Sequence, residues 1–148
     1  MASIRDDENL RRLKQPVRRE GLRFGIDIDG TITQAPRHFK RLIDALMQNG
    51  NRVCIVTARA EPRREETAAF LSALGIHYDQ LVMKPDDWTD TVANYKVRVV
   101  REEDLHMMFD DDEANCWAIE LQTQALAAHM LPIPELPTEM VELLDEEA

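Results

Sequence analysis

From residue 22 onward, short apolar runs alternate with segments whose apolar residues recur at helical spacing. Four of the short runs are rich in β-branched or other apolar residues and end in polar or turn residues, which is typical of buried strands. We therefore predict strands within residues 22–28, 52–57, 78–85 and 105–112.

The segments between these strands predict helices. Residues 38–49 and 62–75 each carry an apolar stripe and end at or next to a glycine, a common helix stop. Residues 89–104 are ambiguous, because YKVRVV alternates like a strand, but the preceding TDT offers good helix caps and we favour a helix. Residues 114–130 predict one further helix, with an apolar stripe of Trp117, Leu121, Ala125 and Ala128 and with Trp117 in the core.

Strands that alternate with helices indicate an α/β fold, in which helices cover both faces of a parallel sheet. We predict a three-layer α/β/α Rossmann-like domain over residues 22–130. Residues 1–21 are dense in charge and predict an N-terminal arm or short helix. Residues 131–148 predict a C-terminal extension, in which LPIPELP runs extended over the body before a short acidic helix.

Composition narrows the class of protein. Hydrophobic residues make up 44% of the 148-residue chain and charged residues 31%, as in ordinary globular proteins. No apolar run approaches the ~20 residues of a membrane span, and the first residues lack the apolar core of a signal peptide. Cys54 and Cys116 are isolated, which favours a reducing compartment, and we expect a cytoplasmic protein.

The net charge of −10 is unevenly distributed. All 18 Lys and Arg residues lie at or before Arg101, whereas half of the 28 acidic residues follow it. A mildly basic body with an acidic end is compatible with binding of small phosphorylated substrates, but it disfavours binding of long duplex nucleic acid.

Polar side chains stand where the predicted strands end. The carboxyl ends of parallel strands meet at one edge of a sheet, so we expect these side chains to converge there. They are Asp27, Asp29, Thr57, Lys84 and Asp110–Asp112.

Several carboxylates share a small space only if a cation neutralises them. The converging ligands are oxygens without a Cys/His cluster, which indicates Mg²⁺ rather than Zn²⁺. With such an ion, one carboxylate can attack phosphorus, while a hydroxyl and an ammonium bind the phosphate oxygens. A second carboxyl two residues along can serve as general acid and base, which would explain the pair Asp27 and Asp29.

The motifs FGIDIDGTIT, IVTAR and MFDDD, in this order, resemble those of the haloacid dehalogenase superfamily of phosphohydrolases. The resemblance covers about residues 22–130 and implies phosphatase activity through an aspartyl-phosphate. It implies that Asp27 is the nucleophile and that Asp29 is the acid/base, with a backbone carbonyl that reaches the metal. It further implies that Thr57 binds phosphate and that Asp110 and Asp111 serve the metal. A response-regulator receiver has similar parts, but there the acid pair comes first and the phosphoacceptor stands alone in mid-chain.

Residues 77–96 resemble the phosphatase domain of polynucleotide kinase–phosphatase and related small phage-type enzymes. This resemblance implies that Lys96 binds phosphate and that Lys84 faces the substrate or an acid, although the strand-end position of Lys84 leaves both lysines open. It also implies that Arg59 contacts a substrate phosphate.

The spacing of the motifs leaves no room for a large cap domain. An open site suits a nucleotide, a nucleic-acid 3′-phosphate end, or a small substrate enclosed by a neighbouring copy, so a homo-oligomer stays open. The alternatives are a sugar or small-metabolite phosphatase, and a non-catalytic module that keeps the fold for binding or assembly.

Overall fold

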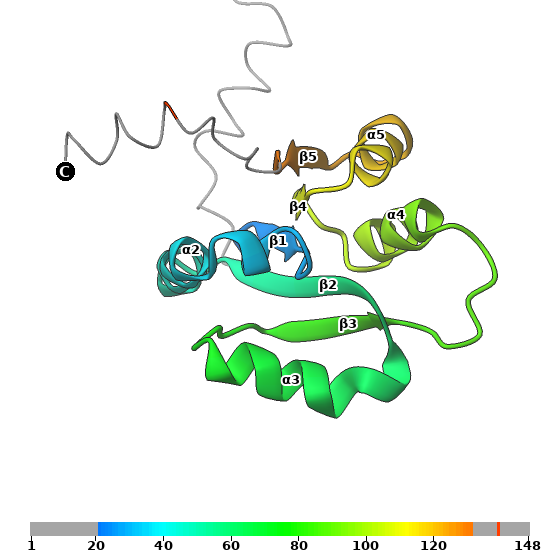
Figure 1. Cartoon of the computed structure of the whole chain (residues 1–148). Helices are drawn as coiled ribbons and strands as arrows, with labels where there is room; N and C mark the ends of the chain where they lie inside the picture. The colour runs from blue at the N-terminus through cyan, green and yellow to red at the C-terminus, as the bar shows by residue number, and fades with distance from the viewer. Residues whose placement is uncertain (1–20, 132–138, 140–148) are drawn as a thin grey trace, which may run out of the picture.

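The computed structural model describes residues 21–131 and residue 139. It contains one sheet of five parallel strands with helices on both faces (Figure 1). The strands are β1 (Arg23–Ile26), β2 (Arg52–Ala60), β3 (Gln80–Lys84), β4 (Met107–Asp110) and β5 (Leu126–His129). The α-helices are α2 (Pro36–Gln48), α3 (Arg64–Ala73), α4 (Val92–Glu102) and α5 (Glu113–Gln122), and short 3₁₀ turns span Ile32–Gln34 and Glu61–Arg63.

The order of the strands in the sheet is β3-β2-β1-β4-β5. β1 therefore lies at the centre and pairs in parallel with both β2 and β4. The order reverses on either side of β1, and ligands of open α/β sheets bind beside the carboxyl ends of the strands at such a point. The predicted α/β/α Rossmann-like class is confirmed, and within the described residues no large cap domain interrupts it.

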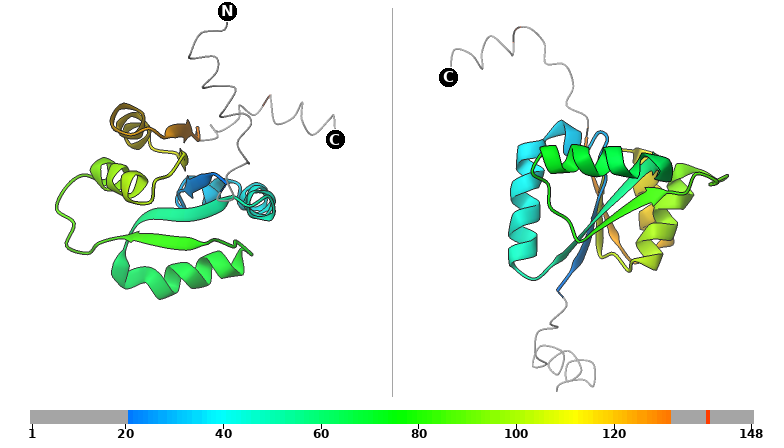
Figure 2. Two further views of the ribbon diagram at one scale, coloured as in Figure 1. Left: turned by 180° about the vertical axis from the view of Figure 1, so that it is seen from behind. Right: turned by 90° about the horizontal axis from the view of Figure 1, so that it is seen from below.

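Two apolar clusters fill the space between the sheet and its helices. Alternate residues of β2 face opposite sides, so Val53 and Ile55 join one cluster and Cys54 and Val56 the other. The first cluster includes residues of α2 and α3, and the second includes residues of α4 and α5. Figure 2 shows α2 and α4 on opposite sides of the sheet.

Polar side chains cap the starts of α4 and α5. The Thr91 side chain accepts a hydrogen bond from the Asn94 N–H at the start of α4, at 3.1 Å. The Asp112 carboxylate does the same for the Asn115 N–H at the start of α5, at 3.0 Å. Such caps satisfy donors that a helix start leaves unpaired. The prediction of a helix in residues 89–104 is confirmed.

The single helix predicted over residues 114–130 is wrong. α5 ends at Gln122, the backbone is extended at Thr123, and Leu126–His129 pair with β4 as the fifth strand. Trp117 is 60% exposed, because α5 buries Cys116 and Ile119 instead. Alanine-rich LAAH favours a helix locally, so pairing with β4 overrides local propensity here.

Two further boundaries concern function. β2 does not end at Thr57 as predicted but continues to Ala60, and its pairing with β3 shifts register between Val56 and Ala60.

The predicted arm (1–21) and extension (131–148) lie almost wholly outside the described residues. Within the described residues, no helix combines the length and apolar character that crossing a bilayer requires.

Candidate functional site

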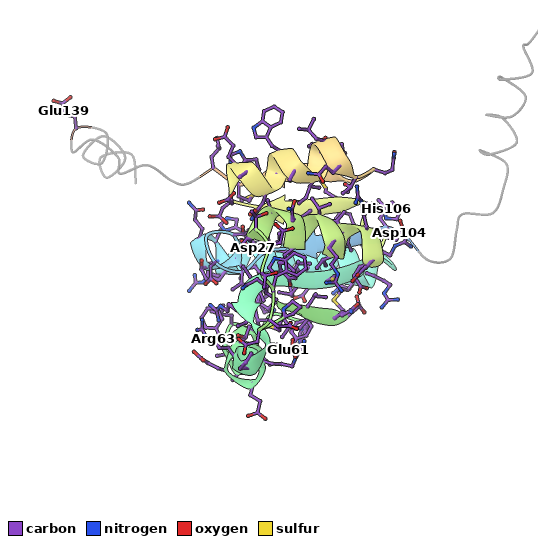
Figure 3. All side chains as sticks on the ribbon, turned by 90° about the vertical axis from the view of Figure 1, so that its right-hand side faces the viewer. Asp27, Glu61, Arg63, Asp104, His106 and Glu139 are labelled. Atoms are coloured by element: carbon purple, nitrogen blue, oxygen red, sulfur yellow. The ribbon has the colours of Figure 1, made fainter. Side chains whose placement is uncertain are left out.

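Asp27 and Asp110 meet at the carboxyl end of the two central strands. The Asp27 N–H donates to the Phe109 carbonyl at 3.0 Å, which holds the residue after β1 against the end of β4. Both residues are buried, with Asp110 fully inaccessible. Asp27 and the turn that carries Glu61 and Arg63 lie away from the end of the molecule that carries Asp104 and His106 (Figure 3).

Lys96 of α4 is the cation of this buried group. Its Nζ lies 2.8 Å from Asp27 Oδ1 and 3.1 Å from Asp110 Oδ2, and it donates to the Val56 carbonyl at 2.9 Å. The Lys96 side chain is 1% exposed. An ammonium is this deeply buried only where charge partners and hydrogen bonds compensate for lost hydration.

Burial dominates the ionisation of Asp27. It raises the pKa of Asp27 from 3.8 to about 7, Lys96 opposes the rise, and the negative charge of Asp110 adds to it. One ammonium thus does not neutralise the carboxylates around it. A divalent cation in this position would favour the ionised form of Asp27.

Asp111 completes a group of three carboxylates. Asp27, Asp110 and Asp111 each place one oxygen within 4.8 Å of the others. Gly30 makes room for this arrangement, because a Cβ on it would overlap the Asp111 carboxylate. Its φ of +81° is also a conformation that favours glycine.

Asn115 supports Asp110 and was missed by the sequence analysis. Its Nδ2 lies 3.3 Å from Asp110 Oδ2 and 3.4 Å from Oδ1, and Asp110 Oδ1 also accepts from the Asp112 N–H at 2.9 Å. These donors fix the carboxylate orientation, as partners of metal ligands commonly do. The sequence offered one signal for Asn115: its amide side chain stands in the first turn of the helix that follows the aspartates at the end of β4.

Asp29 is held by Arg59 and lies outside the three-carboxylate group. The Arg59 guanidinium donates to both carboxylate oxygens of Asp29, at 2.9 and 2.8 Å, and this hydrogen bonding lowers the pKa of Asp29. Arg59 also packs over the Phe70 ring, 5.0 Å from its centroid. The Asp29 side chain is 62% exposed and that of Arg59 13%, so the Asp29 carboxylate marks the solvent-accessible side of the site, which we call its mouth.

Thr57 and Lys84 differ in how close they come to the buried group. Thr57 is fully buried where β2 loses its register with β3, directly after Val56, and its Oγ1 accepts from the Arg59 N–H at 3.1 Å. Lys84 is half-buried at the end of β3. In the part of the chain that the structure describes, no hydrogen bond or salt bridge joins Lys84 to the carboxylates. Of the two candidate lysines, the fold brings only Lys96 to Asp27.

The three carboxylates fit a hard divalent cation. All three donors are oxygens, two of them are buried, and no cysteine or histidine belongs to the group. Such a donor set matches Mg²⁺, which prefers oxygen ligands and leaves positions for water and substrate. The pattern predicted this placement for Asp27, Asp110 and Asp111, but not the diversion of the Asp29 carboxylate to Arg59.

Comparisons with known proteins relate the fold to an RNA repair assembly. Neither protein-family models nor curated proteins match this sequence. A solved structure of the Pnkp1/Rnl/Hen1 RNA repair complex contains a chain that is similar with a TM-score of 0.65 at 17% identity, over 80% of this chain. Another structure of the Pnkp1/Rnl/Hen1 complex matches with a TM-score of 0.63 at 19% identity, over 82%. This chain spans 45% and 49% of those two chains, about half of their length, and at these identities the likeness shows the fold alone.

Proposed function

We propose that this protein is a Mg²⁺-dependent phosphomonoester hydrolase that acts through an aspartyl-phosphate on Asp27. The observation that carries the proposal is the buried group of Asp27, Asp110 and Lys96, with Asp111 beside it. An anionic nucleophile, further carboxylates and an ammonium at one strand edge match the needs of phosphoryl transfer.

In the first half-reaction, an Asp27 carboxylate oxygen attacks phosphorus and the bond to the leaving oxygen breaks. Asp29, protonated for this step, donates its proton to the leaving oxygen, so that the alcohol departs neutral. Before Asp29 can carry this proton, its carboxyl group must be released from Arg59, which donates hydrogen bonds to both of its oxygens. The product is a phosphoryl group on Asp27 and an ionised Asp29.

In the second half-reaction, a water molecule attacks phosphorus and the bond to Asp27 breaks. Asp29 takes the proton from this water, which restores both carboxyl groups and releases inorganic phosphate. Lys96 and Thr57 stabilise charge on the phosphoryl oxygens. Asp27, Asp110 and Asp111, together with the Asp29 backbone carbonyl, would hold a Mg²⁺ ion, which would supply positive charge where the phosphoryl oxygens become more negative.

Substrate binding uses the mouth of the site, where a substrate phosphate competes with Asp29 for the guanidinium of Arg59. We propose a nucleotide or a nucleic-acid 3′-phosphate end as the substrate class. The absence of a large cap from the described residues supports a substrate that is only partly enclosed. The fold similarity to chains of an RNA repair complex is consistent with this class.

The test compares wild type with Asp27→Asn on a generic aryl phosphate, with and without Mg²⁺. We expect Mg²⁺-dependent phosphate release by the wild type and a loss of at least about 1,000-fold in Asp27→Asn. A panel of nucleotides, 3′-phosphorylated oligonucleotides and sugar phosphates then ranks the substrates. Release by neither protein would favour a binding or assembly module, and a preference for sugar phosphates would contradict the nucleotide class.

A further inference from the structure

The side of the molecule formed by α5 and β5 has an apolar surface. β5 is the outermost strand on this side of the sheet, and α5 lies beside it (Figure 1). Six large apolar side chains are exposed among the described residues, and four of them are Trp117, Leu121, Leu126 and Leu131, which belong to α5 or to β5 and the residues after it. Apolar surface gathered in one place normally marks a site of protein association.

α5 presents an apolar ridge on the side away from the core. Cys116 and Ile119 are buried toward the sheet, whereas Ala114, Trp117 and Leu121 are exposed, at intervals of three and four residues. This spacing places the three exposed side chains on one helical face. A helix that is apolar toward solvent as well as toward the core has a second face left to cover. We call Ala114, Trp117 and Leu121 the α5 ridge.

An apolar groove lies on the opposite face of the sheet, on the same side of the molecule. β4 presents Phe109 toward α2, because the alternate residue Met108 packs with α4 and α5. The pairing register puts Leu126 and Ala128 of β5 on the same face as Phe109, where no described helix covers them. The groove between this surface and α2, which we call the α2 groove, has a volume of about 440 Å³. Its lining residues are Ala35, His38, Phe39, Leu42, Phe109 and Met130.

The ridge and the groove have rims of opposite charge. Glu113 and Glu120 flank Trp117 on α5, and neither forms a salt bridge with another described residue. On α2, Arg41 lies one turn after His38 of the groove, is exposed, and likewise has no salt bridge to a described residue. Two ridges in contact would set glutamates against glutamates, whereas a ridge in a groove pairs acid with base.

We propose that a second copy of this chain binds here, with the α5 ridge of each copy in the α2 groove of the other. Ridge and groove lie on opposite faces of the sheet, so a twofold axis parallel to the strands, which exchanges these faces, forms both contacts at once. The pair is closed, and association stops at the dimer. α2 and α5 both begin at the carboxyl end of the sheet, so this axis sets Glu113 of one copy level with the first turns of α2 in the other.

β5 itself is poorly suited to simple strand addition. The Ala127 N–H donates to the Glu120 side chain at 2.7 Å, so this N–H is not free to pair with a strand of another copy. The structure therefore favours contact through the side chains of ridge and groove over a sheet that continues from one copy to the next.

The experiment is sedimentation velocity on the full chain at about 100 μM, where we expect a dimer. Trp117→Ala and Arg41→Glu should each raise the Kd of the dimer by at least about tenfold and leave the circular dichroism spectrum unchanged, since both side chains are exposed. The matched controls are Leu22→Ala and Arg52→Glu, two exposed residues at or just before the starts of β1 and β2, and these should keep the wild-type Kd. A monomeric wild type, or masses that grow beyond the dimer, would overturn the proposal.

A charge reversal tests which surfaces meet. Glu113→Arg should weaken the dimer by itself and should restore it when combined with Arg41→Glu, because the pair of charges is then exchanged. A dimer that Trp117→Ala breaks but Arg41→Glu leaves intact would overturn the proposal in favour of two ridges in contact. A dimer that neither variant affects would place the interface elsewhere and would also overturn it.

A direct contact can be measured between copies. In a dimeric sample that mixes chains labelled with ¹³C at the methionine methyl groups with unlabelled chains, we expect a nuclear Overhauser contact from the Met130 methyl group of one copy to the Trp117 ring of the other. The contact should be lost in Trp117→Ala. Its absence from a dimeric wild-type sample would contradict the proposed placement of the ridge.

Discussion

Removing the ammonium of Lys96 is the sharpest perturbation of the buried charge group. Lys96→Met keeps a long unbranched side chain but leaves Asp27 and Asp110 without their cation, 2.8 and 3.1 Å from the lost Nζ. The matched control is Lys84→Met at the end of β3, which removes a charge from the other candidate lysine. Comparing the two variants tests which of the two lysines stabilises the buried carboxylates.

The structure sets the size of the effect. The Lys96 side chain is 1% exposed, so solvent screens the lost interaction little. Removing one partner of a buried ion pair costs about 3–5 kcal/mol. For a domain of roughly 100 residues, 1 kcal/mol lowers Tm by about 4–8 °C, so Tm should fall by about 12–40 °C in metal-free buffer. Lys84→Met should change Tm by no more than about 4 °C.

The effect should depend on pH and on Mg²⁺. The pKa of Asp27 is already raised to about 7, and without Lys96 it rises further because an opposing interaction is lost. Asp27 is therefore mostly protonated at pH 6 in both proteins, so the loss of Tm in the variant should be smaller at pH 6 than at pH 8, where the wild type has an ionised Asp27 paired with Lys96. Mg²⁺ at pH 8 should restore part of the stability. The assay is thermal unfolding by circular dichroism. An unchanged Tm of Lys96→Met in metal-free buffer at pH 8 would refute the claim that Lys96 stabilises the buried carboxylates of Asp27 and Asp110.

Three further predictions address the rest of the site. Gly30→Ala should weaken Mg²⁺ binding by about tenfold or more, because its Cβ overlaps the Asp111 carboxylate; calorimetry showing wild-type affinity would contradict the placement of Asp111. The stabilisation of the wild type by Mg²⁺ should grow from pH 5.5 to 8. Because the pKa of Asp27 is raised to about 7, the metal-free protein loses stability as the pH rises from about 4 to about 7, and bound Mg²⁺ compensates for the proton that Asp27 loses. A rise of Tm with Mg²⁺ that does not depend on pH would argue against Asp27 as a ligand. Arg59→Ala should raise the pKa of Asp29 in the free enzyme and move the alkaline limb of the kcat/KM profile to higher pH, since hydrogen bonding to Arg59 lowers that pKa; an unshifted limb would exclude Asp29 as the general acid.

Much of the fold follows from signals that are local in the sequence. The strand within residues 22–28 is short, apolar and stopped by Asp-Gly, and Thr91 caps the helix that contains Lys96. Because the carboxyl ends of parallel strands meet at one edge of a sheet, the sequence also predicts that Asp27 and Asp110 lie together. These features depend only on residue type and spacing along the chain, which is why the sequence alone predicts them.

The parts that could not be predicted depend on tertiary contacts. LAAH has no strong strand propensity, and only its pairing with β4 makes it a strand. The salt bridge of Arg59 with Asp29 joins residues 30 positions apart, and no periodicity encodes such a pairing. Which lysine lies beside Asp27 likewise depends on the packing of α4 against the sheet, and the structure places Lys96 there.

The most direct test of the central claim is chemical trapping of the intermediate during turnover. Borohydride reduces an acyl phosphate to an alcohol, so quenching wild-type protein with substrate and Mg²⁺ should convert Asp27 to homoserine, detected by peptide mass spectrometry. The conversion should require both substrate and Mg²⁺ and should be absent in Asp27→Asn. Active turnover with Asp27 left as aspartate in every quenched sample would contradict the claim that this residue carries the phosphoryl group.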